Sequence, residues 1–249
     1  MKVTPMIFNT EMVKALLDGR KAVTRRPVSK VRAGTIDCRT FNKTIVSGRQ
    51  RFAVNQQNPN QEWLAYLFVV GDLIWVRETF CTDPDCDHDS WDDHELSFFE
   101  WNNCGCSAAL LPDALKTNEH CLFKAGGLPD LKWTPSIHMP RWASRLTLRI
   151  TDVRIERVQE ITEDQAKLEG IRYHSLYQEW GGVESHPDSR PHAPQWRWYE
   201  KANDAFKYLW NSIYQNWDEN PYVWVIEFEV IHQNVDKVVS ELGDVCQLR

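Results

Sequence analysis

The chain has no run of about 18 apolar residues, so it offers no candidate for a membrane-spanning helix. Its opening, Met1–Met6, contains no apolar stretch of the secretory type. It also lacks a glycine-rich phosphate loop, a His-Glu-x-x-His helix and a Gly-x-Ser-x-Gly elbow, which excludes three common kinds of catalytic site. These absences favour a cytoplasmic protein with no membrane partner, whose functional site is not built on any of these three motifs.

Lys and Arg are missing altogether from positions 82–104, which hold eight acids. Residues 1–51 show the opposite bias, with twelve Lys or Arg against three acids, in a chain whose net charge is -6. The overall charge argues against a protein that wraps a long polyanion. A basic N-terminal region favours local contact with a phosphate-bearing ligand, and ordinary solvated surface is the alternative.

The seven cysteines are an odd number and do not follow the spacing of a small disulfide scaffold. Several lie with histidines in the acidic stretch, and thiolates with imidazoles are the ligands that zinc prefers. We expect a structural zinc held by Cys86, His88, Cys104 and Cys106. Other candidates, in the surrounding segment 81–131, are Cys81, His94, His120 and Cys121. The alternative is a set of buried or unused thiols.

Apolar periodicity and end signals predict three short helices. The first begins at Thr10 as N-cap and stops at Gly19. The second is capped by Thr162 with Gln165 in a capping box, and it ends at Gly170. The third runs from about 199 to 214, where apolar residues recur at helical spacing.

Strands are predicted at 73–76, 144–158 and 222–231. The first is apolar on both faces and should be buried. The second alternates apolar and polar residues, with a turn expected at Asp152. Non-local strands separated by short helices, without regular β-α alternation, predict an α+β fold built on a mixed β-barrel.

We expect a single domain over 1–232, with irregular insertions at about 28–65, 81–131 and 174–198. The remaining polar residues, 233–249, are expected to form a C-terminal tail, either disordered or a loose helix.

The segment Gly19–Arg26, with Gly19, Lys21 and Arg26 at the key positions, resembles the signature of the ASCH family. This family (activating-signal-cointegrator homology) is a branch of the PUA-like superfamily. The helix before the signature, the Gly71–Val76 strand and the closing Trp224–Phe228 strand follow the family's order. The segment Pro135–Trp142 and the opening also resemble those of phage and prophage proteins. The resemblance implies a PUA-like barrel, a cleft for a nucleobase or nucleoside, and a bacterial host cell if the gene is of phage origin.

The signature is also similar to that of small family members that hydrolyse the amide of N4-acetylcytidine. That similarity implies a catalytic set of Lys21, Thr24 and Glu169, the last because Thr162–Glu169 resembles the helix that carries the family's catalytic Glu. Such chemistry requires an activated nucleophile and a group that moves protons, but no cofactor. Other family members bind RNA or are ribonucleases. A non-catalytic module for RNA or modified DNA, or a ribonuclease, therefore stays an alternative.

Five further residues are candidates for ligand contact. Arg25 and Arg26 carry planar guanidinium groups that suit phosphate or a base edge, with salt bridges as the alternative role. Glu78 ends the predicted central strand and is a reserve acid. Trp75 and Trp142 could stack on a base, with core packing as the alternative. The expected partner is a nucleoside, or a single-stranded or modified nucleic acid.

Overall fold

The computed structural model of the chain describes residues 1–28, 41–47, 50–55, 63–65, 68–82, 116–127, 131–181 and 197–247. It confirms the α+β class and a mixed sheet. The hydrogen-bonded order of the main sheet is β1-β6-β9-β13-β2, in which β1 and β6 are parallel whereas β13 and β2 are antiparallel. Its strands are β1 (Val3–Ile7), β2 (Val23–Pro27), β6 (Leu73–Arg77), β9 (Thr147–Arg157) and β13 (Tyr222–Ile231).

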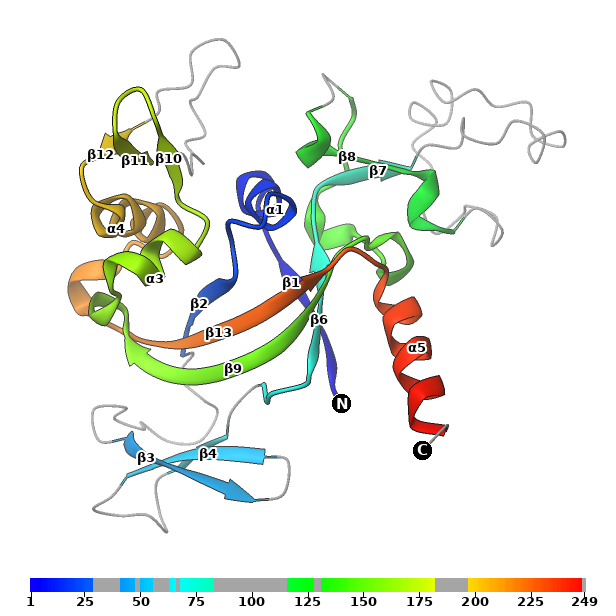
Figure 1. Cartoon of the computed structure of the whole chain (residues 1–249), viewed down its shortest axis with the longest axis horizontal. Helices are drawn as coiled ribbons and strands as arrows, with labels where there is room; N and C mark the ends of the chain where they lie inside the picture. Colours follow the sequence, from blue (N-terminus) through cyan, green and yellow to red (C-terminus); the bar gives the residue numbers. More distant parts are fainter. Residues whose placement is uncertain are drawn as a thin grey trace, which may run out of the picture. The chain divides into compact units, whose positions relative to one another are not determined.

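The chain divides into two compact units. The first comprises Met1–Lys2, Ala15–Asp72 and Arg149–Glu229, and the second comprises Val3–Lys14, Leu73–Leu148 and Val230–Arg249. The long neighbouring strands β9 and β13 (Figure 1) each contribute most of their length to the first unit.

The first unit contains two further small sheets and two helices. One sheet consists of β3 (Phe41–Ser47), β4 (Gln50–Asn55) and β5 (Trp63–Ala65), so a hairpin with a third strand occupies the expected 28–65 insertion. The other consists of β10 (Arg172–His174), β11 (Glu179–Gly181) and β12 (Trp198–Tyr199). The helices are α3 (Glu163–Leu168) and α4 (Ala202–Ile213).

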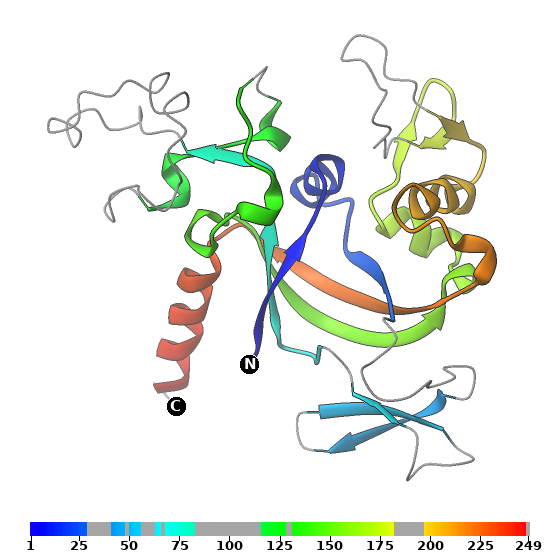
Figure 2. The same ribbon diagram turned by 180° about the vertical axis from the view of Figure 1, so that it is seen from behind.

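The second unit contains β1, β6, a two-stranded sheet and a C-terminal helix. The sheet pairs β7 (Phe80–Thr82) with β8 (Cys121–Phe123), close to the two ends of the expected 81–131 insertion. Phe80, Phe123 and Met139 belong to the buried cluster that packs against it. The helix α5 (Val235–Gln247) is drawn in red in Figure 2. It buries Val235 and Val238 against β6, so this part of the C-terminal segment is a packed helix rather than a disordered tail.

The N-cap of helix α1 (Thr10–Leu17) is Asn9, one residue before the expected N-cap. Asn9 Oδ1, not Thr10, accepts a hydrogen bond of 2.8 Å from the backbone N–H of Met12. Both residue types can cap a helix, and the sequence alone does not choose between neighbours. Gly19, with φ +70°, ends the turn after the helix as expected.

Two strand predictions have different outcomes. All four residues of Leu73–Val76 are buried, which confirms a strand covered on both faces. The turn at Asp152 is wrong, because β9 continues unbroken through that position. The Asp152 side chain accepts a hydrogen bond of 3.1 Å from Arg154 on the same strand, so its polarity serves a side-chain contact and not a reversal of the chain.

Single turns of 3-10 helix lie at Asn118–His120, Lys124–Gly126, Ser136–His138, Arg141–Ala143, Val158–Glu160 and Trp217–Glu219. None of the helices in the described ranges combines the length and the apolarity that crossing a membrane requires.

Candidate functional site: a buried lysine–glutamate pair

Lys21 lies in the short connection between α1 and β2, within the first unit. Its backbone forms an isolated antiparallel bridge with Glu169, and its N–H donates a hydrogen bond of 3.0 Å to the carbonyl of Ala15. The next residue, Ala22, donates to the carbonyl of Leu168 at 3.0 Å. Backbone hydrogen bonds therefore join two segments that are almost 150 positions apart in the sequence.

The side chains of the same two residues form a buried ion pair. Lys21 Nζ lies 2.8 Å from Glu169 Oε2 and also donates to the backbone carbonyl of Glu169 at 2.8 Å. The exposed fractions of the two side chains are 0% and 3%. Burying two charges costs several kcal/mol per ion, which good geometry only partly offsets, so such a pair is weak as a stabilising device. Buried ionisable pairs of this kind are candidates for function.

Interactions at both ends of helix α3 fix the position of Glu169. At the N-terminus, Thr162 and Gln165 form the predicted capping box, which is thereby confirmed. Glu169 is the C-cap residue, where the helix dipole disfavours a negative charge. Two cations, Lys21 and Arg25, offset that cost by donating to the two carboxylate oxygens.

Gly170 allows the close approach of these segments. It has φ +94°, and a Cβ on it would lie 2.7 Å from Ala15 Cβ and 3.2 Å from Lys21 Cβ. A residue with a side chain at this position would be strained in its backbone and would collide with α1. The glycine that ends the helix thus also makes room for Lys21.

Burial lowers the pKa of the Lys21 amino group below its ordinary value of 10.5. The Glu169 carboxylate acts in the opposite direction, while the positive charges of Arg26 and Arg25 lower the pKa further. The net shift is downward, because desolvation disfavours the charged ammonium form. A buried amine of this kind is better suited to accept a proton than a solvated lysine.

Arg25 is the third member of the site. From β2 its guanidinium donates to Glu169 Oε1 and to Gln165 Oε1, each at 3.0 Å, and one nitrogen lies 3.4 Å from Glu156 Oε2. Gln165 Oε1 therefore serves both the helix cap and the arginine. Arg25 Nε is buried and has no hydrogen-bond acceptor among the described residues.

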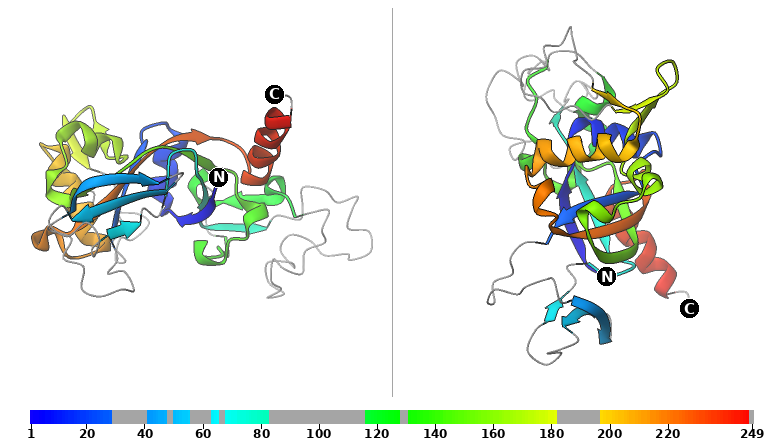
Figure 3. Two further views of the ribbon diagram at one scale, coloured as in Figure 1. Left: turned by 90° about the horizontal axis from the view of Figure 1, so that it is seen from below. Right: turned by 90° about the vertical axis from the view of Figure 1, so that its left-hand side faces the viewer.

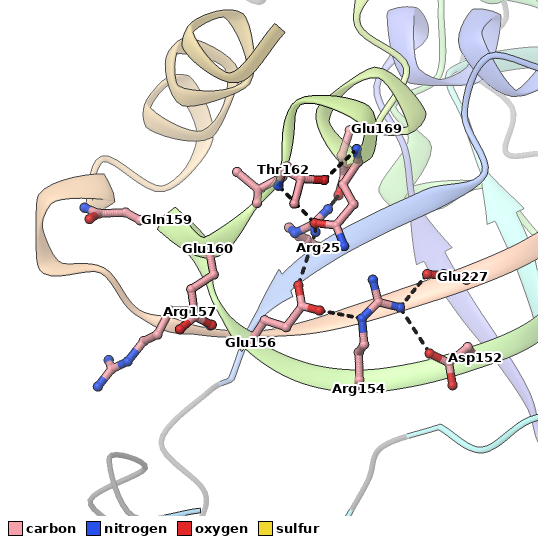
Figure 4. A network of polar contacts seen from close by, with 12 residues as sticks. Arg25, Asp152, Arg154, Glu156, Arg157, Gln159, Glu160, Thr162, Glu169 and Glu227 are labelled. Atoms are coloured by element: carbon pink, nitrogen blue, oxygen red, sulfur yellow. Dashed lines mark hydrogen bonds and ion pairs between the residues drawn. The ribbon is translucent and has the colours of Figure 1, made fainter. Parts of the chain in front are cut away.

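A chain of charges extends from Arg25 along β9 and β13 (Figure 4). Glu156 also accepts from Arg154 Nε at 2.5 Å, and Arg154 in turn contacts Asp152 and Glu227. Three cations (Lys21, Arg25 and Arg154) and four carboxylates (Glu169, Glu156, Asp152 and Glu227) thus form one connected network. The sequence analysis missed its outer part, since nothing in the alternation of β9 indicates which polar residues meet across strands.

Thr24, the remaining predicted catalytic residue, is buried in β2 opposite Ile226. Successive strand residues point to opposite faces, and Arg25 points toward Glu169. Accordingly, no hydrogen bond joins the Thr24 hydroxyl to Lys21 or Glu169. Arg26, the last signature residue, donates to the Tyr214 hydroxyl at 3.2 Å.

The other ligand candidates lie in the second unit. Trp75 is 8% exposed and packs in a core cluster with Leu73, Val235 and Val238, which is the packing that its alternative role describes. Trp142 is partly buried against the Phe80 cluster.

Glu78 is buried and forms two hydrogen bonds of 2.9 Å with Arg145. Burial raises the pKa of the Glu78 carboxyl, although Arg145 acts to lower it.

The predicted zinc ligands Cys86, His88, Cys104 and Cys106 lie outside the described residues. Among the candidates that are described, Cys81 and Cys121 are buried on the paired strands β7 and β8. No group of three or more metal-ligating side chains occurs in the described part of the chain.

No model of a known protein family, no curated protein and no solved structure matches this chain. The site offers a buried amine whose pKa is depressed, a carboxylate that orients it, and an arginine that holds the carboxylate.

Proposed function

We propose that the protein is of the ASCH type, with a PUA-like barrel, and hydrolyses an amide on a modified nucleobase, with N4-acetylcytidine as the reference substrate. The observation that carries the proposal is the buried hydrogen bond between Lys21 Nζ and Glu169 Oε2. These two residues are the lysine and the glutamate that the family resemblance implies as catalytic. Their meeting in one buried pair supports that assignment, because the sequence separates them by almost the length of a small domain.

Lys21 in its neutral form acts as the general base. It takes a proton from an attacking water molecule, whose oxygen adds to the acetyl carbon, and the carbon–nitrogen bond of the amide then breaks. The proton passes to the leaving amino nitrogen, which yields cytidine and acetate. Glu169 orients the lysine and lies where it can share the proton, while Arg25 keeps the carboxylate in place.

The attack is assigned to water because no hydrogen bond joins the Thr24 hydroxyl to Lys21, whose amino group donates to Glu169. A threonine hydroxyl is too weak a nucleophile unless a base lies within hydrogen-bond reach. Thr24→Val separates the two routes: water attack leaves turnover within a few-fold of the wild type. A catalytic Thr24 would make the same variant inactive.

Lys21 is fully buried in this conformation, so a substrate reaches its amine only after neighbouring side chains move. Opening of a closed site on binding is common in enzymes and sets the rate in many of them. The closed pair also keeps water away from the depressed-pKa amine in the absence of substrate.

The proposal is tested by release of cytidine from N4-acetylcytidine, followed by chromatography. Lys21→Met should abolish turnover, while Lys14→Met serves as the matched control, because Lys14 is a partly exposed lysine on α1 paired with Glu11. Glu169→Gln should reduce turnover by about 100-fold, the lower range for a positioned proton-transfer group. Folded protein without turnover, or a Lys21→Met variant as active as the wild type, would refute the proposal. Shortening of single-stranded RNA in its place would indicate the ribonuclease alternative.

A further inference from the structure

The small sheet β10–β12 presents rings on both of its faces. In its register, Tyr173, Trp180 and Tyr199 lie opposite one another and share one face. That face is directed toward the helices, since Tyr199 contacts Tyr208 of α4 and Lys167 of α3 lies over the Trp180 ring. Figure 1 and Figure 3 show the sheet beside these two helices.

The opposite face carries a second group of rings, His174, Tyr177 and Trp198, here called the aromatic face. The Tyr177 ring stacks on His174 with ring centroids 4.4 Å apart and an interplanar angle of 23°. His174 meets Trp198 edge-on at 4.8 Å. Tyr177 nevertheless remains 59% exposed. The ring that stacks on His174 with one side therefore offers its other side to solvent.

The strand β10, which carries His174 of the aromatic face, begins near the lysine–glutamate pair within the same unit. Arg172, the first residue of β10, follows Glu169 by three positions, which limits their Cα separation to about 10 Å. Two cations flank this connection. Arg20 donates to the carbonyl of Gly170 at 2.7 Å and shares its charge with the exposed Asp18, and Arg172 is paired in register with Gly181 beside Trp198.

We propose that the aromatic face binds the bases of a single-stranded nucleic acid, so that the modified base is presented to Lys21 within a strand. Exposed stacked rings bind successive bases irrespective of sequence, and neighbouring arginines contact the phosphates between them. The occupant is a nucleic-acid strand because three rings with adjacent guanidinium groups lack the broad apolar area of a stable protein interface. This inference rests on the proposed function for the reaction, but the binding itself is independent of it.

Binding is measured first, by fluorescence anisotropy of an unmodified, labelled single-stranded oligonucleotide. Tyr177→Ala should weaken the affinity by about 5- to 150-fold, the effect expected for loss of one base-stacking ring. Tyr173→Ala is the matched control, because it removes the same side chain from the same hairpin, with 48% exposure, on the opposite face. That variant should bind as the wild type does.

Hydrolysis is measured second, on free N4-acetylcytidine and on an oligonucleotide that contains it. The wild type should show a higher kcat/KM on the strand, and Tyr177→Ala should lose this gain while keeping its activity on the nucleoside. Failure of the wild type to bind the strand, or equal losses in both tyrosine variants, would overturn the inference. If all three proteins bind as expected but none hydrolyses the nucleoside, the proposed function fails and the aromatic face stands.

Discussion

Gly170→Ala tests whether the close contact between α3 and α1 is as tight as the structure shows. The substitution has two costs that can be separated. The first is conformational, because φ +94° is unfavourable for a residue with a Cβ, at about 1–2 kcal/mol. The second is steric, because the new Cβ would lie 2.7 Å from Ala15 Cβ, and overpacking of this kind costs about 1–3 kcal/mol.

The expected loss in the free energy of unfolding is therefore about 2–5 kcal/mol, a large part of the 5–15 kcal/mol typical of a folded protein. Gly19→Ala is the matched control. Gly19 also has a positive φ, +70°, but a Cβ on it would meet nothing within 4 Å. It should show the conformational cost alone, at about 1–2 kcal/mol.

Urea unfolding followed by tryptophan fluorescence measures both variants. A change in the midpoint concentration is a change in stability when the slope of the free energy of unfolding against urea concentration is unchanged. The double variant Ala15→Gly/Gly170→Ala removes the colliding methyl group and should recover at least about 1 kcal/mol beyond additivity. A Gly170→Ala variant no less stable than Gly19→Ala, or a cycle with no coupling, would refute the reasoning.

Two further variants test the charges that the fold buries. The pKa of Lys21 is lower in the folded protein than in the unfolded chain, so between the folded pKa and 10.5 the unfolded chain binds more protons at this residue. The free energy of unfolding therefore falls as pH falls from 10.5 through the folded pKa. Lys21→Met should remove this dependence of stability on pH, and urea unfolding of the variant and the wild type from pH 7 to pH 10.5 measures it. If the free energy of unfolding changes with pH in the variant as it does in the wild type, the lowered pKa of Lys21 is contradicted. The raised pKa of Glu78 has the opposite consequence, since its contribution is complete below 4.5 and is lost as pH rises through the folded pKa. Glu78→Gln should therefore gain stability relative to the wild type as pH rises above 4.5, and Glu229→Gln, at a largely exposed residue, should not.

Local signals predicted the elements that carry the site. The capping box of Thr162 and Gln165 and the stop at Gly170 are encoded within nine residues, so the helix α3 could be predicted without knowledge of the rest of the chain. The same holds for the buried strand β6, whose apolar residues occupy both faces. The pairing of Lys21 with Glu169 was implied only by the family resemblance, because no local rule joins residues so far apart.

Contacts between distant strands account for what the sequence analysis missed. Arg25 was expected to contact a ligand or to form salt bridges, but the sequence did not indicate which acids it would meet, because its direction depends on where β2 begins, and the strand turns its side chain toward Glu169. The Arg145 partner of Glu78 lies 67 positions away and follows no periodicity. For Trp75 the sequence left base stacking and core packing open. Its burial depends on contact with Val235 and Val238 of α5, a segment whose polar composition does not indicate such packing.

The most direct test of the central claim is the pH dependence of kcat/KM for N4-acetylcytidine in the wild type and in Glu169→Gln. If neutral Lys21 is the base, kcat/KM rises with pH to a plateau whose midpoint lies below 10.5. Since the Glu169 carboxylate raises the pKa of Lys21, its removal should move that midpoint to lower pH even as the maximal rate falls. A midpoint that stays in place in the variant, or a profile with no rise at all, would contradict the account.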